Sequence, residues 1–271
     1  YKYRSCWIID SMKIIFTDLD GTLLDHNNYS FSAAKKGLKI LLQQHIPLIF
    51  CTSKTKAEII YWRKKIKNHH PFISENGGGL FIPIDYFSFC FEYNQKDDSY
   101  YLIRFGAPKD KLKKVMRELE QKFNLESFLS MDINTLMEKT DLPLKQANLA
   151  SKREFDIPFV LYNEKEEKRV IKYIYDQGLQ CTKGGRFYHL MGDNDKGKAV
   201  SKLIRLFKRR FDLIETIGIG DSENDFSMLT QVNHGYLVKK PDNTFSSNEF
   251  NHSEGIGPAG WQNVIEKELN R

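Results

Sequence analysis

Cysteine is scarce in this sequence, which has 4 among 271 residues, namely Cys6, Cys51, Cys90 and Cys181. They form no CxxC pair, so neither a zinc site nor a disulfide framework is predicted, and a reducing cytoplasm is the expected compartment. The sequence also lacks an apolar run long enough to span a membrane, which argues against a membrane protein. Residues 1–11 are too short and too interrupted for a signal peptide, and are expected to be an N-terminal extension ahead of Met12.

The net charge is also small. The sequence has 41 Lys and Arg and 35 Asp and Glu, which gives a net charge of +6. Much of the excess lies within helical patterns at 63–65 and 208–210. This placement favours solvated helix faces over a nucleic-acid surface. Hydrophobic residues at 41% are typical of a globular protein that buries one large core, or a core and a second smaller domain.

Short apolar runs alternate with helical patterns at the start of the chain. The expected strands and helices are, in order, Lys13–Thr17, Ser32–Gln44, Ile46–Cys51, Lys56–Ile66 and a strand at 71–73. A helix at Lys196–Arg209 and a strand at Thr216–Gly220 repeat this pattern later. Strands that alternate with helices predict an α/β fold, in which helices cover both faces of a parallel sheet.

The composition changes from about Ile84, where the chain becomes rich in aromatic residues. Strands are expected at 87–93, 100–105 and 159–162, helices at 109–123 and 165–177, and a surface loop at 242–253. The sequence thus predicts a discontinuous core domain, residues 12–84 and 188–271, with an inserted domain at 85–187.

Acidic residues follow two of the expected core strands. The first strand runs into Asp18 and Asp20, and the late strand runs into Asp221 and Asp225. Ligands of open α/β sheets bind at the carboxyl ends of the strands, so these four carboxylates are expected to converge. Either group alone is typical of a turn or a helix cap. Four converging carboxylates need a cation, and hard oxygen ligands favour Mg²⁺.

The spacing in the first acidic group predicts phosphoryl chemistry. Asp18 ends the strand and is the candidate nucleophile, because a carboxylate beside a metal can attack a phosphate ester and form an aspartyl-phosphate. Asp20 projects to the same side, while Leu19 points into the core. Asp20 is therefore suited to protonate the leaving group and later to deprotonate water. Gly21 lets the backbone turn sharply.

Two further residues fit this chemistry. Thr52 follows the second strand and can donate its hydroxyl to a phosphoryl oxygen, although a helix N-cap is the alternative interpretation. Lys196 can neutralise the nucleophile and the pentacoordinate phosphorus, although an ordinary surface lysine is the alternative here.

Asp18 and Asp20, Thr52, Lys196, and Asp221 with Asp225 occur in the order of the motifs of the haloacid dehalogenase (HAD) superfamily, which this sequence resembles. The resemblance implies a Rossmann-like core with an inserted α/β cap of the C2 type. It also implies that Mg²⁺ is bound by the Asp18 carboxylate, the Asp20 backbone carbonyl and Asp221, with Asp225 supporting the site.

Longer strings narrow the resemblance. Residues 71–79, 153–159, 185–190 and 257–261 are similar to strings of the mannosyl-3-phosphoglycerate phosphatases within this superfamily. That similarity implies hydrolysis of mannosyl-3-phosphoglycerate to mannosylglycerate and phosphate. The alternatives are glucosyl-3-phosphoglycerate or sucrose phosphate as substrate, a sugar phosphomutase, or a binding module without catalysis.

A phosphorylated sugar that also carries a carboxylate needs a second cationic anchor. Arg153 and Arg186 in the inserted domain and Lys54 at the rim of the core are the candidates. The remaining candidate substrate-binding residues are Ser53, Asn76 and Asn224. Asn76 is alternatively a plain turn residue. His189 is expected to be a strand residue rather than a base, and motion between the two domains is expected to exclude water during the reaction.

Overall fold

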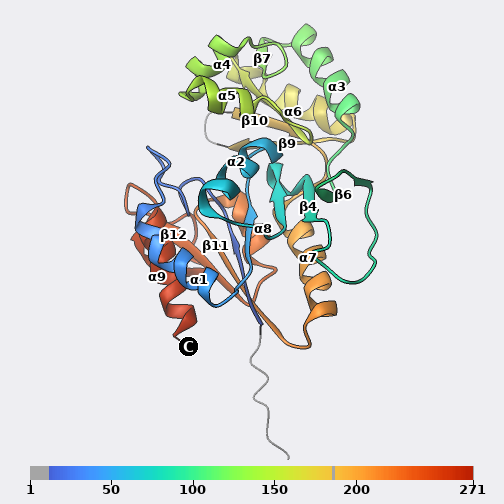
Figure 1. Cartoon of the computed structure of the whole chain (residues 1–271). Coiled ribbons are helices and arrows are strands. Elements are labelled where there is room, and N and C mark those ends of the chain that lie inside the picture. Colours follow the sequence, from blue (N-terminus) through green and yellow to red (C-terminus); the bar gives the residue numbers. More distant parts are fainter. Residues whose placement is uncertain (1–11, 185–186, 271) are drawn as a thin grey trace, which may run out of the picture.

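The computed structural model describes residues 12–184 and 187–270, which form two sheets and the helices that cover them (Figure 1). The larger sheet has nine strands in the order β13-β12-β11-β1-β2-β3-β4-β6-β5. Its strands are β1 (Met12–Thr17), β2 (Leu48–Cys51), β3 (Phe72–Ser74), β4 (Gly79–Pro83), β5 (Gln95–Lys96), β6 (Tyr100–Arg104), β11 (Ile214–Gly220), β12 (His234–Lys239) and β13 (Asn251–Ile256). Neighbours from β13 to β3 are parallel, and β4, β6 and β5 extend the sheet as antiparallel strands.

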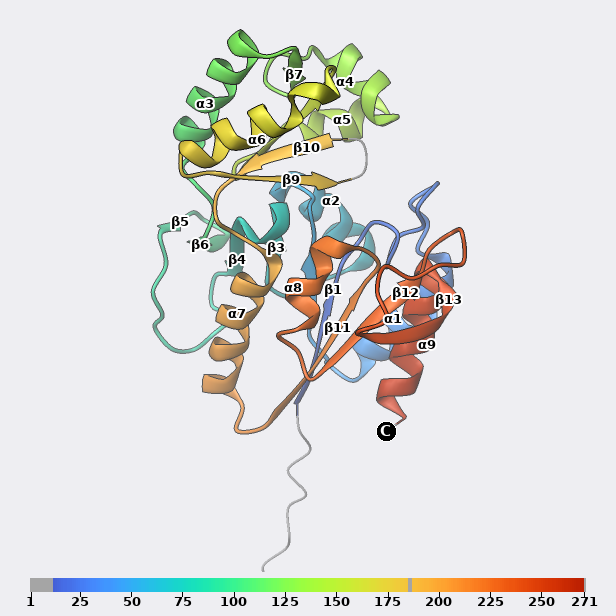
Figure 2. The same ribbon diagram turned by 180° about the vertical axis from the view of Figure 1, so that it is seen from behind.

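Helices cover both faces of this sheet, as Figures 1 and 2 show. One face carries α1 (Lys35–Gln43), α2 (Lys56–Ile66) and α9 (Gly257–Leu269), and the other carries α7 (Lys196–Arg210) and α8 (Phe226–Leu229). Successive side chains of β1 enter opposite cores, since side chains alternate across a strand. Ile15 packs with the first set of helices, whereas Ile14 and Phe16 pack with the second. The continuous apolar run of β1 is therefore explained by burial on both faces.

The smaller sheet belongs to the cap, which we define as residues 107–191. Its strands are antiparallel in the order β7 (Leu125–Ser127), β8 (Asp156–Leu161), β10 (Phe187–Met191) and β9 (Gln180–Gly184). Its helices are α3 (Lys109–Lys122), α4 (Ile133–Thr140), α5 (Leu144–Ala150) and α6 (Glu167–Asp176). Met116 of α3 and Ile174 of α6 pack against Phe159 and Leu190 on one face of the sheet. The sheet lies between these helices and the core (Figure 2).

The two sheets divide the chain differently from the sequence prediction. Residues 100–104 were expected in the inserted domain, but β6 pairs with β4 in the larger sheet. Residues 188–191 were expected in the core, but they belong to β10 of the cap. The change to an aromatic-rich composition after Ile84 therefore does not mark a domain boundary. It arises because β6 and the segment before it add aromatic packing to the core, as when Tyr100 contacts Phe81 edge-on at 6.2 Å between ring centroids.

Two local predictions are wrong. No strand forms at 87–93, where Phe87 instead packs edge-on against Phe207 of α7, 5.4 Å between ring centroids. The predicted loop at 242–253 ends in β13, which pairs with β12. The other predicted strands and helices are present, with ends shifted by a few residues. In the described ranges, every helix is too short or too polar to cross a membrane.

Candidate active site

Asp18 is the first residue after β1, and the neighbouring strand β11 fixes its position. Its backbone N–H donates to the carbonyl of Ile219 at 2.9 Å, which continues the parallel pairing of β1 with β11. Its side chain points into the protein and the residue is only 5% exposed. Gly21 follows with φ of +73°, and a Cβ there would lie 2.8 Å from Asp221 Oδ2. Glycine is thus required both by the turn and by the close approach of the second acidic group.

The carboxyl end of β11 brings the second acidic group to Asp18. Asp18, Asp221 and Asp225 each offer a carboxylate oxygen, and these oxygens all lie within 4.8 Å of one another. The predicted convergence is therefore confirmed for these three residues, whereas the Asp20 carboxylate lies outside the group and pairs with Lys54. The convergence follows directly from the adjacency of β1 and β11 at the centre of the sheet.

Lys196 supplies the positive charge inside this cluster. It is the first residue of α7, whose N-cap Asp195 accepts a hydrogen bond from the Lys198 N–H at 2.9 Å. The Lys196 side chain is fully buried and donates to Asp18 Oδ1 at 2.7 Å and to Asp225 Oδ1 at 2.6 Å. Burial alone would lower the pKa of Lys196. The two carboxylates raise the pKa by more than burial lowers it, so the pKa lies above its ordinary value and the ammonium stays charged. The surface-lysine interpretation is wrong.

One ammonium does not balance three carboxylates. Burial raises the pKa of Asp18 to about 8, with Asp225 and Asp221 adding to the increase and Lys196 opposing it. Burial and the charge of Asp225 likewise raise the pKa of Asp221 to about 7. Such a cluster disfavours its own ionised form until another cation joins it. The donor set consists of hard oxygens, which fits Mg²⁺.

Asp225 supports the cluster. Its Oδ1 accepts from Lys196, and its Oδ2 accepts from the backbone N–H groups of Asp221 at 3.0 Å and Ser222 at 3.2 Å. Both oxygens are thus engaged within the protein, and the carboxylate holds the lysine and the turn after β11 in place. Gly220 makes this possible, since a Cβ there would lie 2.5 Å from the Asp225 side chain.

Thr52 stands at the end of β2 and is completely buried. It is no helix cap, because Thr55 caps α2 through a capping box with Glu58. Lys54, between them, is 7% exposed and places its Nζ 2.8 Å from Asp20 Oδ2 and 3.6 Å from Glu58 Oε1. The structure thus joins the loop after β2 to the candidate general acid Asp20.

Two cavities adjoin this cluster between the core and the cap. One, of about 690 Å³, is lined by Lys196, Ser53, Asn76 and Asn224 from the core and by Lys183 and His189 from the cap. The second, of about 220 Å³, is lined by Asp20, Ser53 and Lys54 from the core and by Arg153, Phe187 and His189 from the cap. The first cavity thus reaches Lys196, which contacts the acidic cluster, and the second reaches Asp20, and both domains line each cavity, as an active site beneath a cap requires.

The family model of haloacid dehalogenase-like hydrolases matches residues 15–246. The chain belongs to this family. It is 44% identical over 259 residues to a glucosyl-3-phosphoglycerate/mannosyl-3-phosphoglycerate phosphatase of Methanococcoides burtonii, covering 93% of this chain and 95% of the relative. It is 34% identical over 228 residues to a mannosyl-3-phosphoglycerate phosphatase of Pyrococcus furiosus, covering 84% and 91%.

Solved structures show the same fold at low sequence identity. A Thermoplasma acidophilum protein superposes with a TM-score of 0.68 at 17% identity, covering 96% of this chain and 100% of that one. A HAD subclass IIB sugar phosphatase superposes with a TM-score of 0.62 at 17% identity, covering 95% and 98%. The HAD-type core with an inserted α/β cap, predicted from the sequence, is confirmed.

A buried polar network joins the cap to the core of this HAD-like hydrolase. The completely buried Glu75 of the core accepts hydrogen bonds from the backbone N–H groups of residues 154–156 of the cap, at 2.7 to 3.1 Å. Arg153 of the cap donates to the Ser53 carbonyl of the core at 2.7 Å and to Asp156 Oδ2 at 2.9 Å. Asp156 also lies 2.8 Å from His189 Nδ1. We call Glu75, Arg153, Asp156 and His189 the cap junction.

The cap junction changes the interpretation of Arg153. The arginine lies beside the site as expected, but two of its donor groups already serve Asp156 and Ser53. It therefore holds the loop after β2 in place, while its role as a carboxylate anchor stays a prediction. Arg186, the other candidate, lies outside the described residues. His189 is a strand residue of β10, as predicted.

The remaining candidate substrate residues lie on the core. Asn76 has φ of +53°, in agreement with the turn-residue alternative, and its Oδ1 accepts from Asn224 Nδ2 at 3.1 Å. Ser53 and Asn224 line the larger cavity with it. Sequence reasoning missed Glu75, although it sits in the glycine-rich string at 71–79. The only available signal was an acidic residue directly after a buried strand.

Proposed function

We propose that this protein hydrolyses the phosphate monoester of glycosyl-3-phosphoglycerates to glycosylglycerate and inorganic phosphate, with mannosyl and glucosyl substrates both accepted. The observation that carries the proposal is the buried Asp18, held by Lys196 beside Asp221 and Asp225, in a family member 44% identical to a relative named for both activities. Membership of a hydrolase family supports hydrolysis over the phosphomutase alternative.

In the proposed mechanism an oxygen of Asp18 attacks the phosphorus in line. A bond forms between Asp18 and phosphorus while the bond from phosphorus to the glycerate oxygen breaks. Asp20 gives its proton to that leaving oxygen. Asp20 then accepts a proton from water, which attacks the aspartyl-phosphate and releases phosphate and the free Asp18 carboxylate. The Thr52 hydroxyl and the Lys196 ammonium orient and neutralise the phosphoryl oxygens.

Mg²⁺ is the proposed cofactor, held by the Asp18 and Asp221 carboxylates and the Asp20 backbone carbonyl, with Asp225 as support. When bound, it neutralises charge on the nucleophile and the phosphoryl group. Its fit rests on the three clustered acidic side chains and on the raised pKa values of Asp18 and Asp221. A cytoplasmic location is proposed with it, and the free thiols of Cys51, Cys90 and Cys181 agree with a reducing compartment.

A phosphate-release screen tests the proposal. The panel contains mannosyl- and glucosyl-3-phosphoglycerate, 3-phosphoglycerate, sucrose phosphate, hexose phosphates and an aryl phosphate, each with Mg²⁺ or with EDTA. We expect the two glycosyl-3-phosphoglycerates to have the highest kcat/KM and EDTA to abolish release. A higher kcat/KM for sucrose phosphate or a hexose phosphate would overturn the substrate assignment, and full release in EDTA would overturn the metal assignment. Isomer formation without phosphate release would indicate a mutase.

A further inference from the structure

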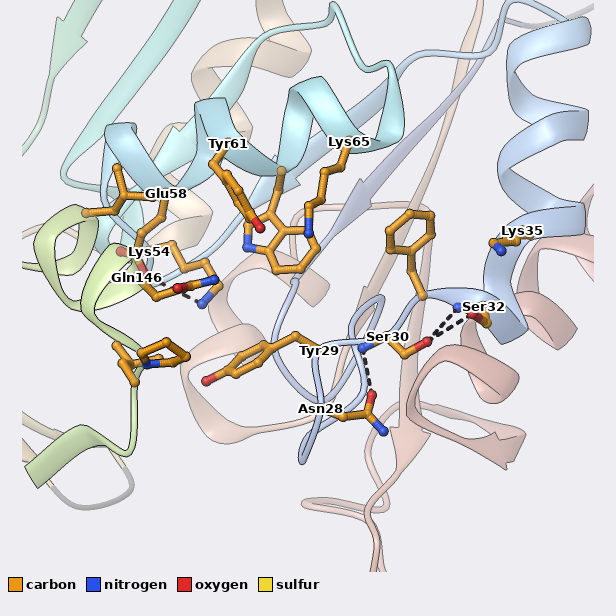
Figure 3. Close-up of a pocket in the computed structure, with 15 residues that line it drawn as sticks. Asn28, Tyr29, Ser30, Ser32, Lys35, Lys54, Glu58, Tyr61, Lys65 and Gln146 are labelled. Atoms are coloured by element: carbon orange, nitrogen blue, oxygen red, sulfur yellow. Dashed lines mark hydrogen bonds and ion pairs between the residues drawn. The ribbon is translucent and has the colours of Figure 1, made fainter. Parts of the chain in front are cut away.

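A third cavity, of about 430 Å³, lies between α2, the segment 28–32 of the core and residues 142–149 of the cap. We call it the α2 pocket. In Figure 3, Tyr61 and Lys65 project from α2, Tyr29 and Asn28 lie on the 28–32 segment, and Gln146 enters from the cap. Its volume lies within the range of small-molecule sites.

The α2 pocket is continuous with the acid side of the active site. It shares Tyr29, Lys54, Glu58 and Leu142 with the 220 Å³ cavity that Asp20 lines. Lys54 Nζ, at the division between the two spaces, lies 2.8 Å from Asp20 Oδ2. Because Asp20 must reach the leaving oxygen, the leaving group is expected to emerge on this side. The α2 pocket is the next space along that path.

Aromatic rings form one wall of this pocket. Trp62 lies 5.3 Å from Tyr61 and 6.4 Å from Tyr29 between ring centroids. Tyr29 has φ of +57°, an unusual conformation for a bulky residue, and its N–H donates to the Asp25 carbonyl at 3.0 Å. The turn around Asp25 thus holds the Tyr29 ring at the pocket in a left-handed backbone conformation, which persists in a bulky residue only where its surroundings fix it.

Most of the other groups around the pocket are polar. The amides of Asn28 and Gln146 and the hydroxyls of Ser30 and Ser32 line it, together with charged and apolar side chains that include Lys35, Glu58, Lys65, Leu142 and Pro143, and Lys54 stands at its inner end. A pyranose ring has an apolar face of C–H groups and an edge of hydroxyls, so aromatic rings and amides together match both of its surfaces. The lysine at the inner end matches a carboxylate.

The larger cavity on the Lys196 side has a different chemistry. Lys183, Lys196 and Lys240 are among its lining residues, and none of those described around it is Phe, Tyr or Trp. The α2 pocket also has three lysines, Lys35, Lys54 and Lys65, so the aromatic wall is what distinguishes the two cavities, and only the α2 pocket offers a surface on which a sugar ring can stack. The larger cavity, which Lys196 lines, therefore suits the phosphate end of a phosphorylated sugar, and the α2 pocket suits the sugar end.

From this division we infer that the α2 pocket binds the hexopyranosyl ring of the leaving group, with Tyr29 and Gln146 as specificity-determining residues. The inference rests on the proposed function, since it takes a glycosyl-3-phosphoglycerate as the substrate. It adds that the sugar lies against α2 and the α5 end of the cap. The cap then contributes to recognition through Gln146 as well as through the cap junction.

The test compares glycosyl-3-phosphoglycerates with 3-phosphoglycerate, which keeps the phosphate and carboxylate but lacks the sugar. We expect Tyr29→Ala and Gln146→Ala each to lower kcat/KM at least tenfold more for the glycosyl substrate, mainly through KM. Tyr29→Phe, which keeps the aromatic ring, is expected to retain most of the kcat/KM for the glycosyl substrate. Lys183→Ala in the larger cavity and the exposed Tyr175→Ala serve as controls without this selectivity. Thermal melting of each variant checks its folding.

The outcomes distinguish failure of the pocket assignment from failure of the proposed function. Equal losses on both substrates in Tyr29→Ala and Gln146→Ala, or a selective loss in Lys183→Ala instead, would overturn the pocket assignment while leaving the proposed function intact. If the wild-type protein releases phosphate from an aryl phosphate but from no glycosyl-3-phosphoglycerate, the proposed function fails and the pocket assignment with it. Competitive inhibition by glycosylglycerate, measured with an aryl phosphate as substrate, must weaken in the same two variants.

Discussion

Lys196 Nζ lies 2.7 Å from Asp18 Oδ1, although 178 positions separate the two residues in the sequence. Both side chains are buried, and the contact joins the end of the first strand to the start of α7. An ion pair that is removed from water contributes little to stability, but breaking it is costly. Its place beside the candidate nucleophile therefore fits the proposed catalytic role better than a role in stability.

Asp18→Asn removes the nucleophile with almost no change in shape. We expect turnover to fall by about 10⁴-fold or more, because catalytic groups that act as a unit lose most activity when one is removed. Lys196 keeps Asp225 as its partner, and burial already raises the pKa of Asp18 to about 8, so the neutral amide is expected to leave thermal stability without Mg²⁺ equal or higher. Phosphate release and thermal melting measure the two effects. Turnover close to that of the wild type would mean that another group attacks the phosphorus.

Lys196→Met leaves Asp18 and Asp225 buried without their shared ammonium. Removing one partner of a buried ion pair typically costs about 3–5 kcal/mol, so we expect a loss of that size in the free energy of unfolding measured with urea. Adding Asp225→Asn removes one of the uncompensated charges and is expected to recover part of the stability but no activity. If Lys196→Met alone is as stable as the wild type, Lys196 does not compensate the buried charges of Asp18 and Asp225.

Arg153→Ala tests the cap junction. Because Arg153 donates to the Ser53 carbonyl, next to Thr52, we expect kcat/KM to fall for glycosyl-3-phosphoglycerates and for a small aryl phosphate alike. Arg169→Ala on α6, which removes an exposed pair with Glu166, is the control and should have little effect. A loss confined to the glycosyl substrate would instead support the sequence-based role of Arg153 as a carboxylate anchor.

His70 predicts a pH dependence of stability. Its Nδ1 lies 2.8 Å from the Tyr86 hydroxyl, and burial, with nearby Arg63, lowers its pKa to about 4 from an ordinary 6.5. Between these values the unfolded chain binds a proton that the folded protein does not. Stability is thus present above pH 6.5 and is lost as the pH falls toward 4, by up to about 1.4 kcal/mol per pH unit from this group.

Urea denaturation between pH 4 and 7 measures this contribution. His70→Gln is expected to show a shallower loss of stability on acidification than the wild type, with the exposed His26→Gln as a matched control for removing a histidine. Equal slopes in the wild type and His70→Gln would exclude His70 as a source of the acid sensitivity.

The sequence predicts the acidic cluster because local rules determine it. Once the first and late strands are parallel neighbours, Asp18 and Asp221 must meet at their carboxyl ends. The cap junction follows no such rule, since the contact of Glu75 with residues 154–156 depends on how the two sheets pack against each other. The same reason explains the misplaced boundary at Ile84. Aromatic composition does not distinguish a new domain from antiparallel strands that extend an existing sheet.

Direct trapping of the intermediate tests the central claim that Asp18 forms a covalent bond to phosphorus. Turnover of a glycosyl-3-phosphoglycerate with Mg²⁺ is stopped with acid, treated with borohydride and digested for mass spectrometry. Reduction of an aspartyl-phosphate yields homoserine, so the account predicts homoserine at position 18, and none when substrate is omitted. Homoserine at a different aspartate, or none during active turnover, would contradict the account.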